Sequence, residues 1–187
     1  MGRLDGRVAL ITGASRGLGL YCALGYAAEG ARVAIAARTT EEQDPRLPGT
    51  IYHTAQLIEA NGGTALPVVC NVADDDSVND AVSQVLDTWG QVDILMNNAA
   101  IQPPGNNADI QDKHWRLIYN VNVHGPFRCV RALLPSMRER GTGNIINISS
   151  GATSGGSPYG GTKRALEAMT EGVSRRNWQQ MASPPMP

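Results

Sequence analysis

Tyr159 and Lys163, in the stretch YGGTK, have the residue types and the spacing needed for acid–base chemistry. Residues four apart share one face of an α-helix, so the phenol and the ammonium group are expected to lie side by side. A phenol ordinarily has a pKa of about 10, and a nearby positive charge stabilises its phenolate form. We therefore expect Tyr159 to exchange a proton and Lys163 to activate it, although this spacing is also common by chance.

A glycine-rich stretch, TGASRGLG at 12–19, directly follows an apolar run and precedes a helical pattern. There Gly13 permits a tight turn, Gly17 lets the backbone approach an anion, and Gly19 allows close packing of the helix on the strand. Free N–H groups at the start of the helix favour a pyrophosphate. The alternative is a plain strand-to-helix turn. The predicted cofactor-binding residues of this loop are Thr12, Gly13, Ser15, Arg16, Gly17, Leu18 and Gly19.

The second apolar run ends in AIAARTT, at the position that distinguishes NAD from NADP in dinucleotide-binding folds. Enzymes that use NAD place a carboxylate there, but Ala37 occupies the acidic position and Arg38 follows it. Arg16 in the glycine loop could reach the same place, and two guanidinium groups suit a 2′-phosphate. We therefore expect NADP in preference to NAD. The alternative is that both arginines are solvated surface side chains.

Five short apolar runs alternate with helical patterns along the chain. The runs are RVALIT, ARVAIAA, TALPVVC, VDILMN and GNIINIS, and the helical stretches fall near 17–29, 50–61, 74–88, 112–139 and 159–175. Such alternation is typical of right-handed βαβ units, and apolar runs without polar alternation indicate strands covered on both faces. The predicted fold is therefore α/β, a doubly wound parallel sheet of the Rossmann type with strand order 3-2-1-4-5.

Several of these motifs, in their order along residues 5–175, resemble those of the short-chain dehydrogenase/reductase family. They are the glycine loop, CNVAD at 70–74, NNAA at 97–100, NVNVHGPF at 120–127 and YGGTK. The resemblance implies cofactor contacts at Asn71, Val72 and Asn98, with Asn71 replacing the family's aspartate and Ala100 replacing its glycine. It also implies that Asn122 is a catalytic residue that holds a water in a proton relay. The alternative is that Asn122 caps or kinks a helix.

The family's substrate-orienting serine lies at the end of the fifth strand. Ser150 occupies that end, nine residues before Tyr159, which is a shorter spacing than is usual in the family. Ser149 should face the other way along the strand, while Ser154 and Ser157 belong to the loop. The resemblance thus implies the catalytic set Asn122, Ser150, Tyr159 and Lys163, with Tyr159 and Lys163 also contacting the cofactor, and hydride transfer between a nicotinamide and a carbonyl or alcohol.

The substrate class follows from a second resemblance. Residues 37–74 look like the branch of hydroxysteroid dehydrogenase-like type 2 proteins and related bacterial enzymes that act on terpenoid alcohols or lipids. This similarity implies a small apolar carbonyl or alcohol substrate.

Composition excludes several other classes of protein. With 187 residues, 42% of them hydrophobic, the chain has room for one sizeable core. Sixteen basic and seventeen acidic side chains give a net charge of −1, which disfavours nucleic acid and anionic membranes as partners. Three widely spaced cysteines in apolar segments indicate neither a disulfide framework nor a metal site. No apolar run reaches membrane-spanning length and no signal peptide is evident, so we expect a cytoplasmic protein.

The last stretch, RRNWQQMASPPMP, has no apolar period, whereas members of the family continue into a sixth and a seventh strand. We therefore expect one NADP-binding domain at 1–175 and an aberrant, unstructured tail at 176–187, with the strand at 143–149 left as a sheet edge. Shifting the reading frame back by one base permits a family-like continuation, so truncation by a frameshift is our hypothesis. The alternative is a natural short variant.

Truncation also leaves two interpretations of the function open. One is an active oxidoreductase, and the other is an inactive or weakly active dinucleotide-binding remnant of such an enzyme. Members of the family form homo-oligomers, but truncation would disfavour one here.

Overall fold

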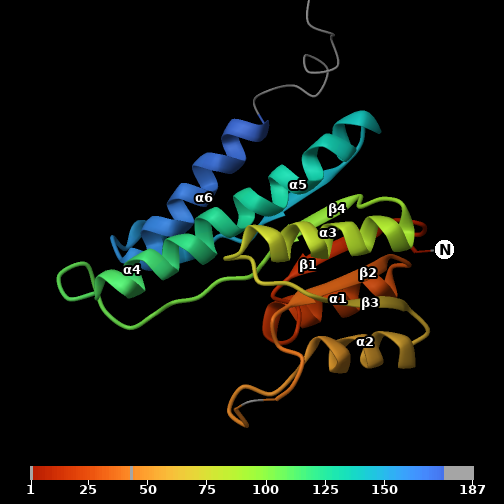
Figure 1. The fold of residues 1–187 in the computed structure, drawn as a ribbon, viewed down its shortest axis with the longest axis horizontal. Helices are drawn as coiled ribbons and strands as arrows, with labels where there is room; N and C mark the ends of the chain where they lie inside the picture. The colour runs from red at the N-terminus through yellow and green to blue at the C-terminus, as the bar shows by residue number, and fades with distance from the viewer. Residues whose placement is uncertain (1, 43, 175–187) are drawn as a thin grey trace, which may run out of the picture.

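The computed structural model describes residues 2–42 and 44–174, which form a parallel five-stranded sheet between two layers of helices (Figure 1). The order of the strands is β3-β2-β1-β4-β5, as predicted from the sequence. The strands are β1 (Val8–Thr12), β2 (Arg32–Ala37), β3 (Thr64–Val69), β4 (Ile94–Asn97) and β5 (Asn144–Asn147). The predicted tail at 176–187 lies outside the described residues, and the division at residue 175 stays a prediction.

The helices follow the predicted stretches closely. They are α1 (Gly17–Ala28), α2 (Ile51–Ala60), α3 (Asp75–Trp89), α4 (Asp112–Tyr119), the π-helical turn η1 (Asn120–His124), α5 (Gly125–Glu139), the 3₁₀ turn η2 (Gly151–Ser154) and α6 (Pro158–Ser174). Side-chain caps stabilise the starts of several of them. At α2, for example, Thr50 accepts a hydrogen bond from the N–H of His53, and at α3 Asp74 accepts one from that of Ser77. None of the described helices is long and apolar enough to cross a membrane.

Alternating side chains of the strands form two cores, one on each face of the sheet. On one face Ala9 and Ile11 of β1 pack in a cluster with residues of α1 and α2. On the other face Val8 and Leu10 pack in a cluster with residues of α3 and α5. Helix α6 contacts α4, η1 and β5. This double cover explains why the strand sequences are apolar throughout.

Strand β5 differs from the central strands. Among the described residues it pairs on one side, with β4, and is therefore an edge, as expected. Its residues Ile145 and Ile146 are only half-buried, whereas all five residues of β1 are buried. The strand is also shorter than the predicted run of 143–149.

The helical stretch predicted at 112–139 has these bounds in the structure, but the π-helical turn η1, which the sequence analysis did not predict, divides it into α4 and α5. The N–H of Gly125 donates to the carbonyl of Asn120, five residues earlier. Pro126 follows and has no N–H to offer to the carbonyl of Asn122. The helical hydrogen-bond ladder therefore shifts by one residue at this place, and the wider turn carries Asn122.

A buried carboxylate, that of Asp93, binds several segments at the amino ends of the strands. Asp93 is 4% exposed, and its Oδ2 accepts a hydrogen bond of 2.8 Å from the N–H of Val8. Its Oδ1 lies 3.1 Å from Nη1 of Arg140, and the guanidinium of Arg7 is 3.7 Å away. Arg140 also donates to the carbonyl of Val92. These contacts join the starts of β1 and β4 to the end of α5.

Replacing this carboxylate tests its contribution to stability. In Asp93→Ala the N–H of Val8 and the guanidinium of Arg140 lose a buried partner, so the free energy of unfolding should fall by about 3 kcal/mol. Urea denaturation followed by circular dichroism measures the change. Asp112→Ala is the matched control, because its exposed pair with Arg116 should contribute almost nothing. Equal losses in the two variants would contradict the prediction.

Candidate functional site

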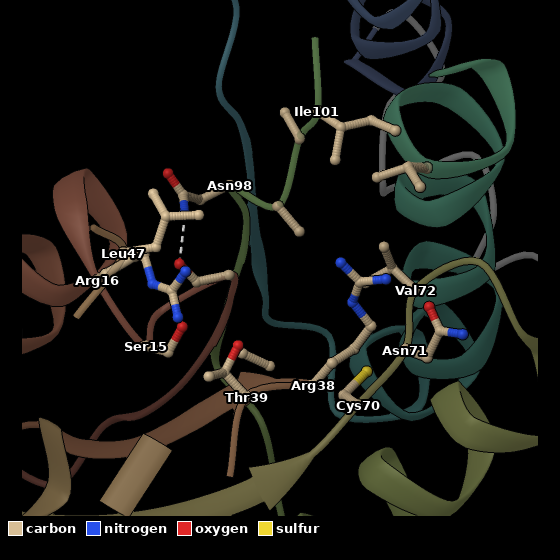
Figure 2. Close-up of a pocket in the computed structure, with 15 residues that line it drawn as sticks. Ser15, Arg16, Arg38, Thr39, Leu47, Cys70, Asn71, Val72, Asn98 and Ile101 are labelled. Atoms are coloured by element: carbon tan, nitrogen blue, oxygen red, sulfur yellow. Dashed lines mark hydrogen bonds between the residues drawn. The ribbon is translucent and has the colours of Figure 1, made fainter. Parts of the chain in front are cut away.

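A cavity of about 370 Å³ lies at the carboxyl ends of the strands, beside the glycine loop (Figure 2). Seven of the predicted cofactor residues line it: Gly13, Ser15, Arg16, Arg38, Asn71, Val72 and Asn98. Its wall also includes residues that sequence reasoning did not select, among them Thr39, Leu47 and Ile101. Carboxyl ends of parallel strands are the usual place for a ligand in an open α/β sheet.

Thr12 and Asn98 join the glycine loop to the segment after β4. The Thr12 hydroxyl accepts hydrogen bonds of 3.1 Å from the N–H groups of both Asn98 and Ala99. In return, Nδ2 of Asn98 donates to the carbonyls of Thr12 and Gly13, at 2.9 and 3.1 Å. Thr12 is buried and does not line the cavity, so here it fixes the turn that forms one wall.

The three glycines of the loop are required for different reasons. Gly13 has φ +68°, and a Cβ atom there would lie 2.8 Å from Cα of Ala99. Gly17 has φ +56° with open space around it. A Cβ on Gly19 would lie 2.5 Å from the Gly13 carbonyl oxygen and 2.6 Å from Nδ2 of Asn98. The backbone is therefore packed as tightly as the predicted phosphate-binding turn requires.

The start of α1 is suited to an anion. Arg16 is its N-cap residue and forms no side-chain capping hydrogen bond, in contrast to Thr50 and Asp74. The first N–H groups of a helix have no partner within the helix, and its dipole favours negative charge there. An uncapped helix start beside an arginine-lined cavity fits the diphosphate of a dinucleotide. Leu18, in the first turn of α1, is 54% exposed and lies outside the cavity lining.

Arg16 and Arg38 lie on separate sides of the cavity (Figure 2). Nη2 of Arg16 donates to the carbonyl of Gly49 at 3.0 Å, which ties the glycine loop to the segment after β2. Arg38 is exposed, points into the cavity and makes no hydrogen bond or ion pair within the described ranges. Arg38 is thus the freer of the two guanidinium groups for an anionic ligand.

The wall opposite the glycine loop comes from the turn after β3. Oδ1 of Asn71 accepts a hydrogen bond of 3.2 Å from the N–H of Ala73. The backbone N–H of Asn71 donates to the hydroxyl of Ser77. Val72 is 8% exposed and faces the cavity. Burial raises the pKa of the Cys70 thiol in this wall to about 11, so it stays protonated and unreactive near neutral pH.

Tyr159 and Lys163 lie together near the start of α6, as their spacing predicted. Nζ of Lys163 is 5.6 Å from the centre of the Tyr159 ring and donates to the carbonyl of Ile148 at 2.7 Å. Lys163 is 2% exposed, and this burial lowers the pKa of its ammonium group. Neither residue lines the 370 Å³ cavity. A buried ammonium beside a phenol ring can stabilise negative charge on the phenol oxygen.

Asn122 is buried in the π-helical turn and binds the backbone after β4. Its Oδ1 accepts from the N–H of Ile101 and its Nδ2 donates to the carbonyl of the same residue, both at 2.9 Å. Nδ2 also lies 3.1 Å from the hydroxyl oxygen of Thr162 on α6. The amide therefore holds the cavity wall, the π-helical turn and α6, which carries Tyr159, in one arrangement. The sequence analysis did not identify its partners Ile101 and Thr162.

Ser150 is half-buried and lies three residues beyond the end of β5. Its hydroxyl oxygen accepts a hydrogen bond of 3.2 Å from the N–H of Ala152, which caps the 3₁₀ turn η2 and leaves the hydroxyl hydrogen available. Ser149 instead donates to Glu167 on α6. A Cβ on Gly160 would lie 2.2 Å from the Ala152 carbonyl oxygen. This close contact between η2 and α6 accommodates the short connection from Ser150 to Tyr159.

Comparison with known proteins agrees with the motifs. The family described as short chain dehydrogenase matches residues 7–180. The chain belongs to this family. A metagenomic short-chain oxidoreductase solved in complex with NADP superimposes with a TM-score of 0.85 and 31% identity, covering 94% of this chain and 78% of that one. A chain from Xanthomonas campestris gives a TM-score of 0.85 and 35% identity, covering 94% of this chain and 67% of that one.

Curated relatives support the predicted branch of the family. Hydroxysteroid dehydrogenase-like protein 2 of Mus musculus is 43% identical over 148 residues, which are 79% of this chain and 30% of that protein. The protein of the same name from Homo sapiens is 41% identical over 148 residues, covering 79% and 35%. The chain thus spans about one third of the length of the curated relatives it matches.

The packing of Gly19 gives a stability prediction. Gly19→Ala places a methyl group against the Gly13 carbonyl and should lower the free energy of unfolding by about 1–3 kcal/mol. Gly25→Ala in the same helix is the matched control, because nothing lies within 4 Å of its Cβ position. That change should raise stability by about 0.5–1 kcal/mol. Chemical denaturation of both variants measures the effects, and a Gly19→Ala protein as stable as the parent would contradict the packing argument.

Proposed function

We propose that this chain is an NADP-preferring oxidoreductase that transfers hydride between the nicotinamide and a small apolar carbonyl or alcohol substrate. The observation that carries the proposal is the pairing of Tyr159 with buried Lys163 on a helix that Asn122 anchors to the cavity wall. Membership of the short chain dehydrogenase family and the names of the hydroxysteroid dehydrogenase-like relatives support the reaction and the apolar substrate. The NADP complex of a similar chain supports the cofactor.

The residues that would hold the cofactor follow the walls of the cavity. The uncapped start of α1, with Ser15, Arg16 and Gly17, would bind the diphosphate, and Arg38 would bind the 2′-phosphate. Asn71, Val72 and Asn98 would enclose the adenosine half. When bound, the nicotinamide supplies or accepts the hydride.

The chain's own residues would manage the proton. Tyr159 would donate or accept it at its hydroxyl oxygen, and the ammonium of Lys163 would stabilise the phenolate and bind ribose hydroxyls. Ser150 would orient the substrate oxygen with its free hydroxyl hydrogen. Asn122 would anchor the relay through its position in the π-helical turn.

A second candidate is dinucleotide binding without turnover. The observation that favours it is that Ser150, Tyr159 and Lys163 do not line the cavity, whereas most of the predicted cofactor residues do. NADPH binding and carbonyl reduction measured on the same purified chain distinguish the two. Binding with turnover supports the oxidoreductase, binding alone supports the second candidate, and absence of both contradicts both proposals.

Cofactor preference depends on Arg38. Arg38→Asp replaces a guanidinium by a carboxylate beside the 2′-phosphate, so the ratio of NADP to NAD affinity should fall by about 10-fold or more and favour NAD. Fluorescence titration with both cofactors measures the ratio. Arg3→Asp changes the charge equally at an exposed site outside the cavity and should leave the ratio unchanged. An unaltered ratio in Arg38→Asp would remove this residue from phosphate binding.

Proton transfer depends on Tyr159. Tyr159→Phe removes the hydroxyl that exchanges the proton, so turnover should fall by about 10²–10⁴-fold while NADPH affinity is largely kept. Tyr21→Phe, at a tyrosine that is 71% exposed on α1, controls for loss of a phenol hydroxyl elsewhere. Steady-state rates and cofactor titration of both variants provide the measurement. Near-parental turnover in Tyr159→Phe would exclude this residue from the mechanism.

A further inference from the structure

Arg128 of α5 makes contacts with three other segments of the chain. Its side chain is 14% exposed. Nη1 donates to the carbonyls of Val72 and Asn120, at 3.2 and 3.3 Å, while Nε lies 3.2 Å from Oδ2 of Asp75 at the start of α3. This hydrogen bond lowers the pKa of the Asp75 carboxyl. One guanidinium therefore holds the turn after β3, the first turn of α3 and the π-helical turn together.

The segments that Arg128 joins carry both halves of the candidate site. Val72 forms part of the cofactor cavity, and Asn120 stands two residues before Asn122 in η1. The two segments also touch directly, because Nδ2 of Asn120 donates to the carbonyl of Ala73 at 3.2 Å. A Cβ on Gly125 would lie 3.0 Å from Cβ of Val72, so this contact is close.

The planar guanidinium suits this position because its donors point in fixed directions. It can reach two carbonyl oxygens and a carboxylate at once, which the compact ammonium of a lysine does less well. Without it, the Val72 carbonyl loses a partner in a region largely shielded from water. Arg131 offers a useful contrast: it also pairs with Asp75, but from an exposed position, and the hydrogen bonds to the carbonyls of Val72 and Asn120 come from Arg128 instead.

We propose that Arg128 is a positioning residue that fixes the Val72 wall of the cofactor cavity to the turn that carries Asn122. It touches neither reacting group and acts through the backbone of both segments. The inference rests on the proposed function, since it assumes that the cavity binds NADP(H). Arg128 links cofactor binding at one end of the site to the placement of the relay asparagine at the other.

Cofactor titration of three variants tests this role without requiring turnover. Arg128→Met should weaken NADPH binding by about 3- to 30-fold, measured on folded protein by fluorescence. Arg128→Lys should recover part of the affinity, because its ammonium can still donate to one of the two backbone carbonyls. Arg131→Met should bind NADPH as the parent does. If the parent is active, Arg128→Met should also lower kcat, whereas a change confined to the cavity wall would alter only the affinity.

The outcomes separate this inference from the proposed function. No NADPH binding by the parent chain overturns the proposed function and the inference with it. Binding by the parent with equal affinity in Arg128→Met overturns the inference alone. Equal weakening in Arg128→Met and Arg131→Met also overturns it, because that result assigns the effect to the charge around Asp75. Thermal melting of each variant identifies unfolded protein. If Arg128→Met does not fold, Arg128→Lys is compared with the parent instead, and equal NADPH affinity in these two proteins would overturn the inference.

Discussion

The side-chain amide of Asn122 is the contact on which the candidate site depends. It satisfies both the N–H and the carbonyl of Ile101 and reaches the hydroxyl of Thr162, which directly precedes Lys163. The residue is 1% exposed, so a broken hydrogen bond would leave buried polar atoms without partners. The segment after β4, the π-helical turn and α6 are therefore constrained to keep one arrangement, and Tyr159, to which we assign the proton exchange in our proposal, lies on α6.

Most of the fold could be predicted from the sequence because its signals are local. Apolar runs such as that of β1 identify buried parallel strands, and capping residues such as Asp74 mark helix starts. The π-helical turn could not be predicted in this way. Pro126 was visible, but a proline is tolerated in the first turn of a helix. The hydrogen bonds that hold Asn122 in the wider turn run to Ile101, 21 residues away along the chain.

In the candidate site, too, local motifs could be predicted from the sequence, whereas contacts between distant segments could not. The glycine loop and the Tyr159–Lys163 pair are short motifs, so their residue types and spacing, together with the order of the motifs along the chain, were enough to predict where they lie. Arg128 was missed because Val72 lies 56 residues away from it along the chain. The bond of Arg16 to Gly49, 33 residues away, was missed for the same reason. Such contacts exist only once the sheet order brings the segments together.

Buried charges at the two ends of the sheet differ in whether they have a partner of opposite charge. Asp93, at the amino ends, is surrounded by the guanidinium groups of Arg7 and Arg140 and by a backbone N–H, so its charge is compensated within the protein. Lys163, beyond the carboxyl ends, is buried to a similar degree, yet within the described ranges it forms no ion pair and binds a neutral carbonyl. Burial without an anion is unfavourable for an ammonium, which is why its pKa is lowered. The charge of Asp93 is paired within the fold, whereas that of Lys163 has no ion pair among the described residues and, in the reaction that we propose, would stabilise a phenolate at Tyr159.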